Sequence, residues 1–155
     1  MSVEADPELG KDADERIAVV DEATNEIVGS ARRAEMRRDN LPHRATYVFL
    51  RVRGGSPNNP RMWVQKRTMT KDYCPGYIDP TAGGVVGAGE DYDINAQREL
   101  EEEMGVVAKV ATRDSLGSGH GIKEMGGEEE AMLRHCFNFH YKDARTNVWG
   151  GAFDC

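Results

Sequence analysis

Three glutamates in one predicted helix have the spacing of metal ligands. We predict a helix that includes Ala96–Met104, with about 100° between successive side chains. In this helix Glu99, Glu102 and Glu103 share one face. Like charges at i,i+3 or i,i+4 cost a helix about 0.2–0.5 kcal/mol per pair, and a bound divalent cation offsets that repulsion. Because oxygen ligands favour hard ions, we expect Mg²⁺ or Mn²⁺ at this face rather than zinc.

An acidic run alone is most often a solvated face, and we interpret Glu128–Glu130 in that way. The run in the helix differs because an apolar stripe of Ala96, Leu100 and Met104 lies beside the carboxylates. Such a stripe can pack on a sheet. One edge of the helix is therefore expected to be buried, while the neighbouring edge presents an anionic strip.

The residues around this helix complete a longer pattern, G-x5-E-x7-R-E-U-x-E-E-x-G-U, in which U is a bulky apolar residue. Every fixed position is filled between Gly84 and Val106, with Glu90 as the first acidic position. From ordinary residue usage, a chance match in a given register is expected about once in 10⁹ trials or less. The pattern is the Nudix signature, and the chain resembles the Nudix superfamily.

The resemblance extends beyond the signature. The segment Met62–Val106 is similar to the usual Nudix run of strand, PG loop, GG strand and signature. Further upstream, VDEATNEIV and HRATYVFL resemble the branch related to isopentenyl-diphosphate isomerase. The resemblance implies an α+β Nudix fold, which is an α/β/α sandwich with a mixed β-sheet and the Nudix loop–helix–loop.

The resemblance also implies a Mg²⁺-dependent hydrolase that cleaves a diphosphate bond in a nucleoside diphosphate derivative or a related metabolite. By this similarity Glu99, Glu102 and Glu103 bind the metal, and the backbone carbonyl of Gly83 adds another ligand. Glu102 is our first candidate for the general base that takes a proton from the attacking water, and Glu99 is the second. A base from Glu128–Glu130 is left open.

The other positions of the signature support these ligands in the same interpretation. Arg98 and Glu90 orient the carboxylates and the loop. Gly84 and Gly105 provide backbone freedom at the two ends of the signature. The basic residues ahead of the PG loop are candidate phosphate clamps: Arg67 and Lys71.

Hydrolysis is favoured over isomerisation. Isomerases of the related branch need a catalytic cysteine in a T-x-C-x-H-P-type segment, whereas Asp79–Val85 (DPTAGGV) contains neither Cys nor His. His43 matches a metal-site histidine of the isomerases, but its partners are absent, so we interpret it as structural. An isomerase-type enzyme is kept as an alternative.

A second alternative is a Nudix-fold binding module without turnover. Nudix domains usually continue with another strand and a C-terminal helix, and this sequence stops at Cys155. Two expectations follow for the Nudix domain over residues 16–155: either it is truncated and lacks these two elements, with some substrate contacts missing, or its fold is closed differently.

The elements that must position these residues follow from hydrophobic periodicity and turn residues. Ser30 is the predicted N-cap of a helix over residues 31–38, and Gly105 stands at the C-cap of a helix over residues 91–104. The connection over residues 68–80 is long enough to suggest a functional loop. Strands are predicted over residues 16–21, 27–28, 43–53, 62–67, 81–86, 107–116, 131–141 and 148–154. This mixed order is typical of an α+β fold.

The composition restricts the function further. The net charge of −7 argues against sequence-independent nucleic-acid binding, and no apolar run reaches the roughly 20 residues of a membrane span. The 3 cysteines are widely spaced, as expected for a reducing, cytoplasmic compartment. We interpret residues 1–15 as a disordered acidic tail. The expected partner is a small-molecule diphosphate, bound by a monomer or a homodimer.

Overall fold

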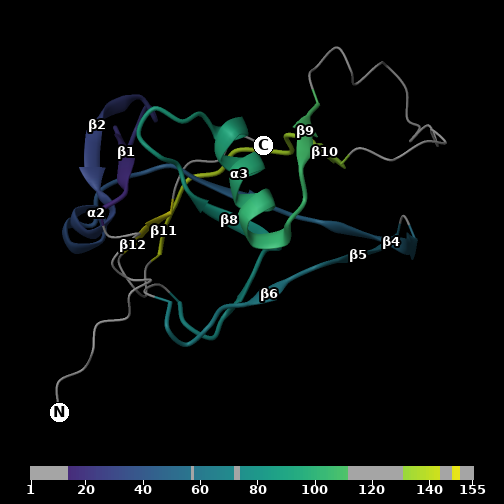
Figure 1. Cartoon of the computed structure of the whole chain (residues 1–155). Coiled ribbons are helices and arrows are strands. Elements are labelled where there is room, and N and C mark those ends of the chain that lie inside the picture. The colour runs from purple at the N-terminus through teal and green to yellow at the C-terminus, as the bar shows by residue number, and fades with distance from the viewer. Residues whose placement is uncertain (1–13, 57, 72–73, 112–130, 144–147, 151–155) are drawn as a thin grey trace. The chain divides into compact units, whose positions relative to one another are not determined.

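A computed structural model of the chain describes residues 14–56, 58–71, 74–111, 131–143 and 148–150 (Figure 1). The chain divides into two compact units. The first contains the residues up to Thr46, Val85–Asn95 and the residues from Cys136, and the second contains Tyr47–Gly84 and Ala96–His135. None of the helices in the described part of the chain has both the length and the apolar surface needed to cross a bilayer.

The first unit begins with an antiparallel strand pair and a short helix. Strand β1 (Arg16–Val20) pairs with β2 (Ile27–Arg32), and α2 (Arg33–Asp39) follows directly. The pair β11 (Tyr141–Asp143) and β12 (Val148–Gly150) is also antiparallel. Burial of apolar side chains stabilises this unit. Its core is formed by Ile17, Met36 and Val85, with Val19 and Leu41 packed against them.

The start of α2 differs from the predicted one. Ser30 is not its N-cap, because the β1–β2 ladder continues to Arg32, which pairs with Arg16. The Ser30 hydroxyl instead accepts a hydrogen bond from Arg16 Nη2 at 2.6 Å. The N-cap is Arg32, whose backbone N–H donates to Glu35 Oε2 at 3.0 Å. Pairing between strands thus outweighed the local capping preference of serine.

His43 is structural, as predicted. Its side chain is buried, and Nδ1 lies 2.9 Å from the Leu41 carbonyl oxygen, which can only accept a hydrogen bond. Nδ1 therefore carries the proton of a neutral imidazole. Burial lowers the pKa of His43 from 6.5 to about 4, because it disfavours the charged form.

The second unit is built from short strand pairs and most of the acidic helix. Strand β4 (Arg51–Ser56) is antiparallel to β5 (Asn59–Met62), and β6 (Gln65–Lys66) is antiparallel to β7 (Ile78–Asp79). Strand β9 (Ala108–Val110) is parallel to β10 (Ala131–Leu133). The buried core residues are Val48, Ala82, Leu100 and Ala108.

Three elements contain residues of both units. Strand β3 (Ala45–Val48) pairs with β8 (Ala82–Val85), and α3 (Tyr92–Met104) carries the acidic signature. Helix α3 begins one residue after the predicted start and ends at the predicted residue. Gly105 follows with a φ of 66°, and its N–H donates to the Glu101 carbonyl at 2.8 Å, which confirms the predicted C-cap.

The long strand predicted over residues 43–53 is wrong, because the chain forms β3 and β4 with a break at Phe49 and Leu50. At the break, the Leu50 carbonyl still accepts from the Trp63 N–H at 3.0 Å, and the Thr81 side chain bonds the Leu50 N–H. Leu50 N–H donates to Thr81 Oγ1 at 2.9 Å, and that hydroxyl donates to the Trp63 carbonyl at 2.6 Å. A side-chain hydroxyl can satisfy backbone groups that would otherwise need a ladder partner.

Most of the remaining predicted strands are shorter in the structure, whereas the strand predicted over residues 27–28 extends to Arg32. Residues 62–67 are divided between β5 and β6, and residues 131–141 between β10 and β11. Residues 112–116 and 151–154 of two predicted strands, and residues 1–13 of the predicted tail, lie outside the described residues. Glu15, which was assigned to the tail, belongs to the fold because its carboxylate pairs with Arg33 at 2.9 Å. The described elements are mixed α+β, with two helices and small sheets, in agreement with the predicted class.

Candidate functional site

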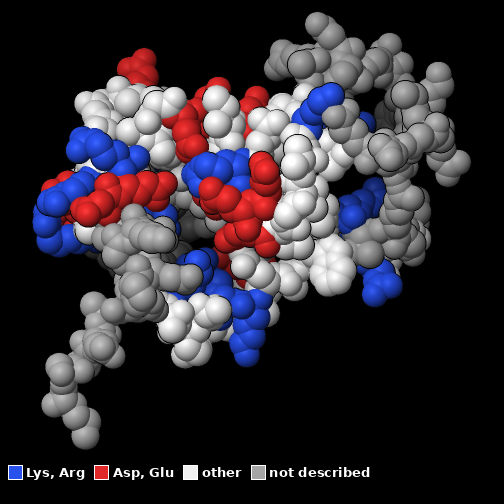
Figure 2. Space-filling view, viewed as in Figure 1, with Lys and Arg blue, Asp and Glu red and all other residues white. Residues whose placement is uncertain are grey.

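Helix α3 presents the predicted carboxylates on the side adjacent to its buried stripe. Leu100 is buried in the core of the second unit and Ala96 packs against that core, whereas Glu102 and Glu103 are exposed. At the other end, Asp91 Oδ1 accepts a hydrogen bond from Ile94 N–H at 2.9 Å and caps the helix. Acidic side chains gather over α3 in Figure 2, with basic atoms among them. The predicted buried edge is confirmed at Ala96 and Leu100, whereas Met104, the third residue of the predicted stripe, is exposed at the end of the helix.

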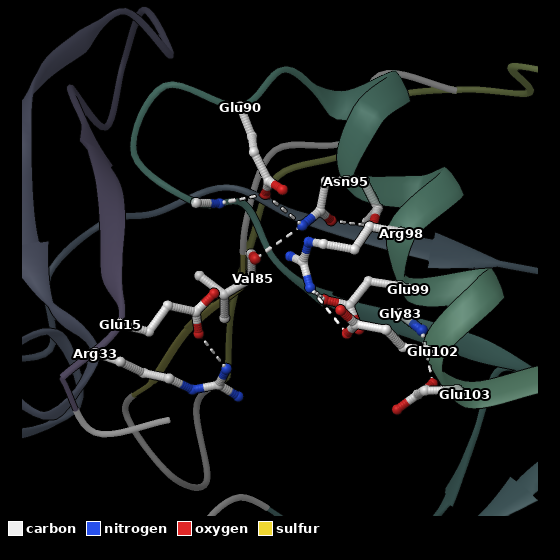
Figure 3. Close-up of polar contacts among 12 residues, drawn as sticks. Glu15, Arg33, Gly83, Val85, Glu90, Asn95, Arg98, Glu99, Glu102 and Glu103 are labelled. Atoms are coloured by element: carbon white, nitrogen blue, oxygen red, sulfur yellow. Dashed lines mark hydrogen bonds and ion pairs between the residues drawn. The ribbon is translucent and has the colours of Figure 1, made fainter. Parts of the chain in front are cut away.

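Arg98 joins two of the three predicted metal ligands. Its Nη1 lies 3.1 Å from Glu99 Oε1 and 3.1 Å from Glu102 Oε2 (Figure 3). The Glu99 side chain is 13% exposed and that of Glu102 is 59% exposed. The guanidinium of Arg98 contacts both carboxylates and therefore offsets the repulsion between their negative charges.

Gly84 makes room for the carboxylate of Glu99. A Cβ built on Gly84 would lie 2.7 Å from Glu99 Oε2 and still closer to Oε1 and Cδ. Such distances are shorter than van der Waals contact. The predicted role of Gly84 as a site of backbone freedom is thus replaced by a steric one, because the glycine is needed for the space that it leaves.

The third carboxylate, Glu103, is held by the strand that carries the Gly-Gly pair. Gly83 N–H donates to Glu103 Oε2 at 3.2 Å, and Gln65 Nε2 lies 3.4 Å from the same oxygen. Gly83 was predicted to act through its carbonyl, and the structure brings its peptide unit beside Glu103. Gln65 was not predicted, since nothing in the helix pattern points to a residue on β6.

The carboxylates of α3 offer the donor atoms of a divalent-cation site but are not gathered around one point. Among the residues that the structure describes, no three His, Cys, Asp or Glu side chains are grouped to hold a metal ion. Glu99 and Glu102 face Arg98, and Glu103 faces Gly83. The donor set itself is all oxygen and strongly anionic, which suits Mg²⁺ or Mn²⁺. The residues fit such an ion in their chemistry.

Glu90 closes the loop that precedes α3. Its Oε2 accepts hydrogen bonds from Gly87 N–H at 2.9 Å and from Asn95 Nδ2 at 3.1 Å (Figure 3). These two hydrogen bonds link the loop to α3, and the loop-supporting role of Glu90 stays a prediction. Asn95 was missed, although it is fully buried. The sequence offered one signal for this residue. Asn95 stands one helical turn before Glu99, so its side chain lies on the helix face that carries the glutamates.

The two predicted phosphate clamps have different environments. Arg67 Nη1 lies 2.8 Å from Asp79 Oδ2, and both side chains are largely shielded from solvent. Lys71 is exposed, and its backbone N–H donates to the Thr68 carbonyl at 3.4 Å. The alternative base segment, Glu128–Glu130, lies outside the described residues. Arg67 is therefore an ordered cation with a carboxylate partner, whereas Lys71 lies at the surface.

Comparison with known proteins shows which family the chain is similar to. The family model of the NUDIX domain matches residues 41–148. The chain is 37% identical over 131 residues to the uncharacterized Nudix hydrolase YfcD of Escherichia coli, which covers 84% of this chain and 58% of that protein. It is 43% identical over 107 residues to an uncharacterized Nudix hydrolase of Pseudomonas aeruginosa, with 69% and 56% coverage. The chain thus spans a little over half the length of these relatives.

A solved structure is similar as well. The crystal structure of DR0079 from Deinococcus radiodurans matches with a TM-score of 0.52 and 31% sequence identity. The match covers 60% of this chain and 54% of that one.

Proposed function

The chain belongs to the Nudix hydrolase family, and from that premise we propose that it is a Mg²⁺- or Mn²⁺-dependent diphosphohydrolase. Its substrate is a nucleoside diphosphate linked to another moiety, or a related small metabolite. The observation that carries this proposal is the carboxylate cluster of α3, in which Arg98 lies 3.1 Å from both Glu99 and Glu102. A diphosphate is itself anionic, so it can approach this cluster only when cations offset the charge.

Each residue has a role in the proposed reaction. Bound Mg²⁺ would supply charge neutralisation for the phosphate oxygens and would lower the pKa of a water. Glu99, Glu102 and Glu103, with the Gly83 carbonyl, would hold the metal. Glu102, the more exposed of the two carboxylates beside Arg98, would accept the proton of the water that attacks phosphorus. Arg98 would orient the carboxylates.

Hydrolysis is proposed in preference to isomerisation because the segment Asp79–Val85 offers no thiol and no imidazole. The cysteine nearest to this segment in the sequence is Cys74, which lies before the PG loop and outside Asp79–Val85, with a backbone φ of 46°. We further propose the α/β/α layering of the family for the complete fold. A cytoplasmic location, and a monomer or homodimer that binds neither nucleic acid nor membrane, complete the proposal.

A substrate panel tests the proposal. The protein is incubated with nucleoside diphosphate derivatives and Mg²⁺, and the release of nucleoside monophosphate is measured. Glu102→Gln is expected to lower kcat by about 10²–10⁴-fold, the range of general acid–base catalysis. Glu101→Gln is the matched control, because Glu101 lies on the same helix at the variable position of the signature and is exposed. It is expected to stay within about 2-fold of wild type.

Three outcomes would overturn the proposal. Full activity of Glu102→Gln would show that Glu102 is neither the general base nor a required metal ligand. Conversion of isopentenyl diphosphate to its allylic isomer without hydrolysis would replace hydrolysis with isomerisation. An absence of turnover across the panel, with Mg²⁺ still bound, would identify a binding module.

A further inference from the structure

Asn95 is a fully buried amide at which three segments of the first unit meet. Its Nδ2 donates to the Val85 carbonyl at 2.9 Å and to Glu90 Oε2 at 3.1 Å. Its Oδ1 accepts a hydrogen bond from Thr46 Oγ1 at 2.5 Å. The side chain therefore contacts β3, the end of β8 and the loop before α3 from a single position on the helix (Figure 3).

The chemistry of an amide suits this position. A primary amide has two N–H donors and one carbonyl acceptor, and here both donors and the acceptor are used. Aspartate has the same shape but would set a carboxylate against two acceptors, the Val85 carbonyl and Glu90 Oε2. An apolar residue would leave these buried groups without their donors, which is costly in a protein interior.

The contact with Glu90 controls the loop between β8 and α3. Glu90 Oε2 accepts from Gly87 N–H, so Asn95 and Gly87 meet at one oxygen atom. The fit is close, since a Cβ on Gly87 would lie 3.0 Å from that oxygen. A shift of the Glu90 carboxylate would therefore open the Gly87 hydrogen bond.

We propose that Asn95 is a positioning residue that holds Glu90, and through Glu90 the loop 87–90, against the end of β8. This fixes the start of α3 against Val85 at the end of β8. Asn95 precedes Glu99 by one helical turn, so a shift of Asn95 along the helix axis would also displace the carboxylates of the same helix. The inference rests on the proposed function only where metal affinity is measured.

Amide hydrogen exchange at Gly87 tests the proposal directly. Glu90→Ala removes the acceptor and sets the maximal exchange rate of the Gly87 N–H. We expect Asn95→Ala to accelerate that exchange by at least about 10-fold, and Glu90→Ala combined with Asn95→Ala to add no more than about 2-fold. Asn95→Asp, which keeps the shape and loses the donors, should behave as Asn95→Ala does.

Gln97→Ala is the matched control. Gln97 lies two positions further along α3 and also donates its amide to a backbone carbonyl, that of Ala108 at 2.7 Å. Its removal should lower stability without changing Gly87 exchange by more than about 2-fold. Gly87 exchange in folded Asn95→Ala that stays within about 2-fold of wild type would overturn the proposal. So would an equal acceleration in Gln97→Ala.

Glu90→Ala alone covers the case in which neither Asn95 variant folds. It leaves Asn95 in place, and the Nδ2 protons of Asn95 should then exchange at least about 5-fold faster than in wild type. Unchanged Nδ2 exchange would mean that the Asn95–Glu90 contact does not form, and would also overturn the proposal.

Metal affinity gives a readout that general destabilisation would not change. Mn²⁺ titration followed by electron paramagnetic resonance should show a Kd at least about 5-fold higher for Asn95→Ala than for Gln97→Ala. Equal Kd values would confine Asn95 to a structural role. If the wild type binds Mn²⁺ but hydrolyses nothing, the proposed function fails while the Gly87 and Mn²⁺ measurements still decide the role of Asn95.

Discussion

Arg67, directly after β6, forms an ion pair with Asp79 of β7, with 2.8 Å between Nη1 and Oδ2. The predicted phosphate clamp is therefore oriented by a carboxylate. Backbone contacts fix the same segment, since Arg67 N–H donates to the Tyr77 carbonyl at 2.9 Å and Gly76 N–H donates to the Arg67 carbonyl at 3.1 Å.

Because of this pairing, the two predicted clamps should respond differently to mutation. Arg67→Met is expected to lower the free energy of unfolding by about 1–3 kcal/mol, since it removes a hydrogen-bonded partner from the shielded Asp79 carboxylate. Lys71→Met should change it by less than about 0.5 kcal/mol, because Lys71 is exposed. Urea denaturation measures both values.

If both residues bind the diphosphate, KM should rise by about 10-fold in each variant, which corresponds to about 1.4 kcal/mol of lost binding. An unchanged KM in Lys71→Met would leave Lys71 as an ordinary surface charge.

Gly84→Ala should impair the metal site. The added Cβ would occupy the space of the Glu99 carboxylate. We expect kcat/KM to fall by at least about 10²-fold, because small displacements of catalytic groups can cost that much. Gly29→Ala is the control, since nothing lies within 4 Å of a Cβ built there. Wild-type kinetics in Gly84→Ala would mean that the Glu99 carboxylate can move aside without loss.

Metal binding should stabilise the protein. At a free Mg²⁺ concentration 100 times its Kd, the free energy of unfolding should rise by about 2.7 kcal/mol. Glu99→Gln should lose most of this increment and Glu101→Gln should retain it. Thermal unfolding with Mg²⁺ and with EDTA provides the comparison. An equal increment in Glu99→Gln would locate the ion elsewhere.

His43 should make stability depend on pH. Its pKa is about 4 in the folded protein and 6.5 in the unfolded chain, so the unfolded chain binds more protons between these values. Stability is therefore fully present above pH 6.5 and is lost as the pH falls toward 4, by about 3 kcal/mol. His43→Gln, which does not titrate, should lack this component. His135→Gln is the control because His135 is exposed. A wild-type pH profile in His43→Gln would contradict the assignment.

The sequence was sufficient for the parts of the fold that depend on local periodicity. The boundaries of α3, the cap at Gly105 and the division of α3 into two edges follow from spacing alone. Strand breaks were not predictable in this way. The break between β3 and β4 depends on Thr81, which is about thirty residues away along the chain, and no local pattern reports a hydrogen bond at that separation.

The candidate site was predictable in its ligands but not in its supports. Glu99, Glu102 and Glu103 fall at fixed spacing within one helix. Gln65 and Asn95 do not, because their roles depend on which strands meet the helix. A buried asparagine beside an anionic face is also ambiguous, since the same residue in another fold would face solvent.

The lack of room for a Cβ at Gly84 restricts which codons the gene can carry at this position. Every amino acid other than glycine adds a carbon at that position, and the carboxylate of Glu99 already fills it. Each nonsynonymous codon change at position 84 should therefore be removed by selection wherever catalysis is needed, while synonymous changes accumulate freely. Gly29, which faces open space, should accept replacements over the same evolutionary time.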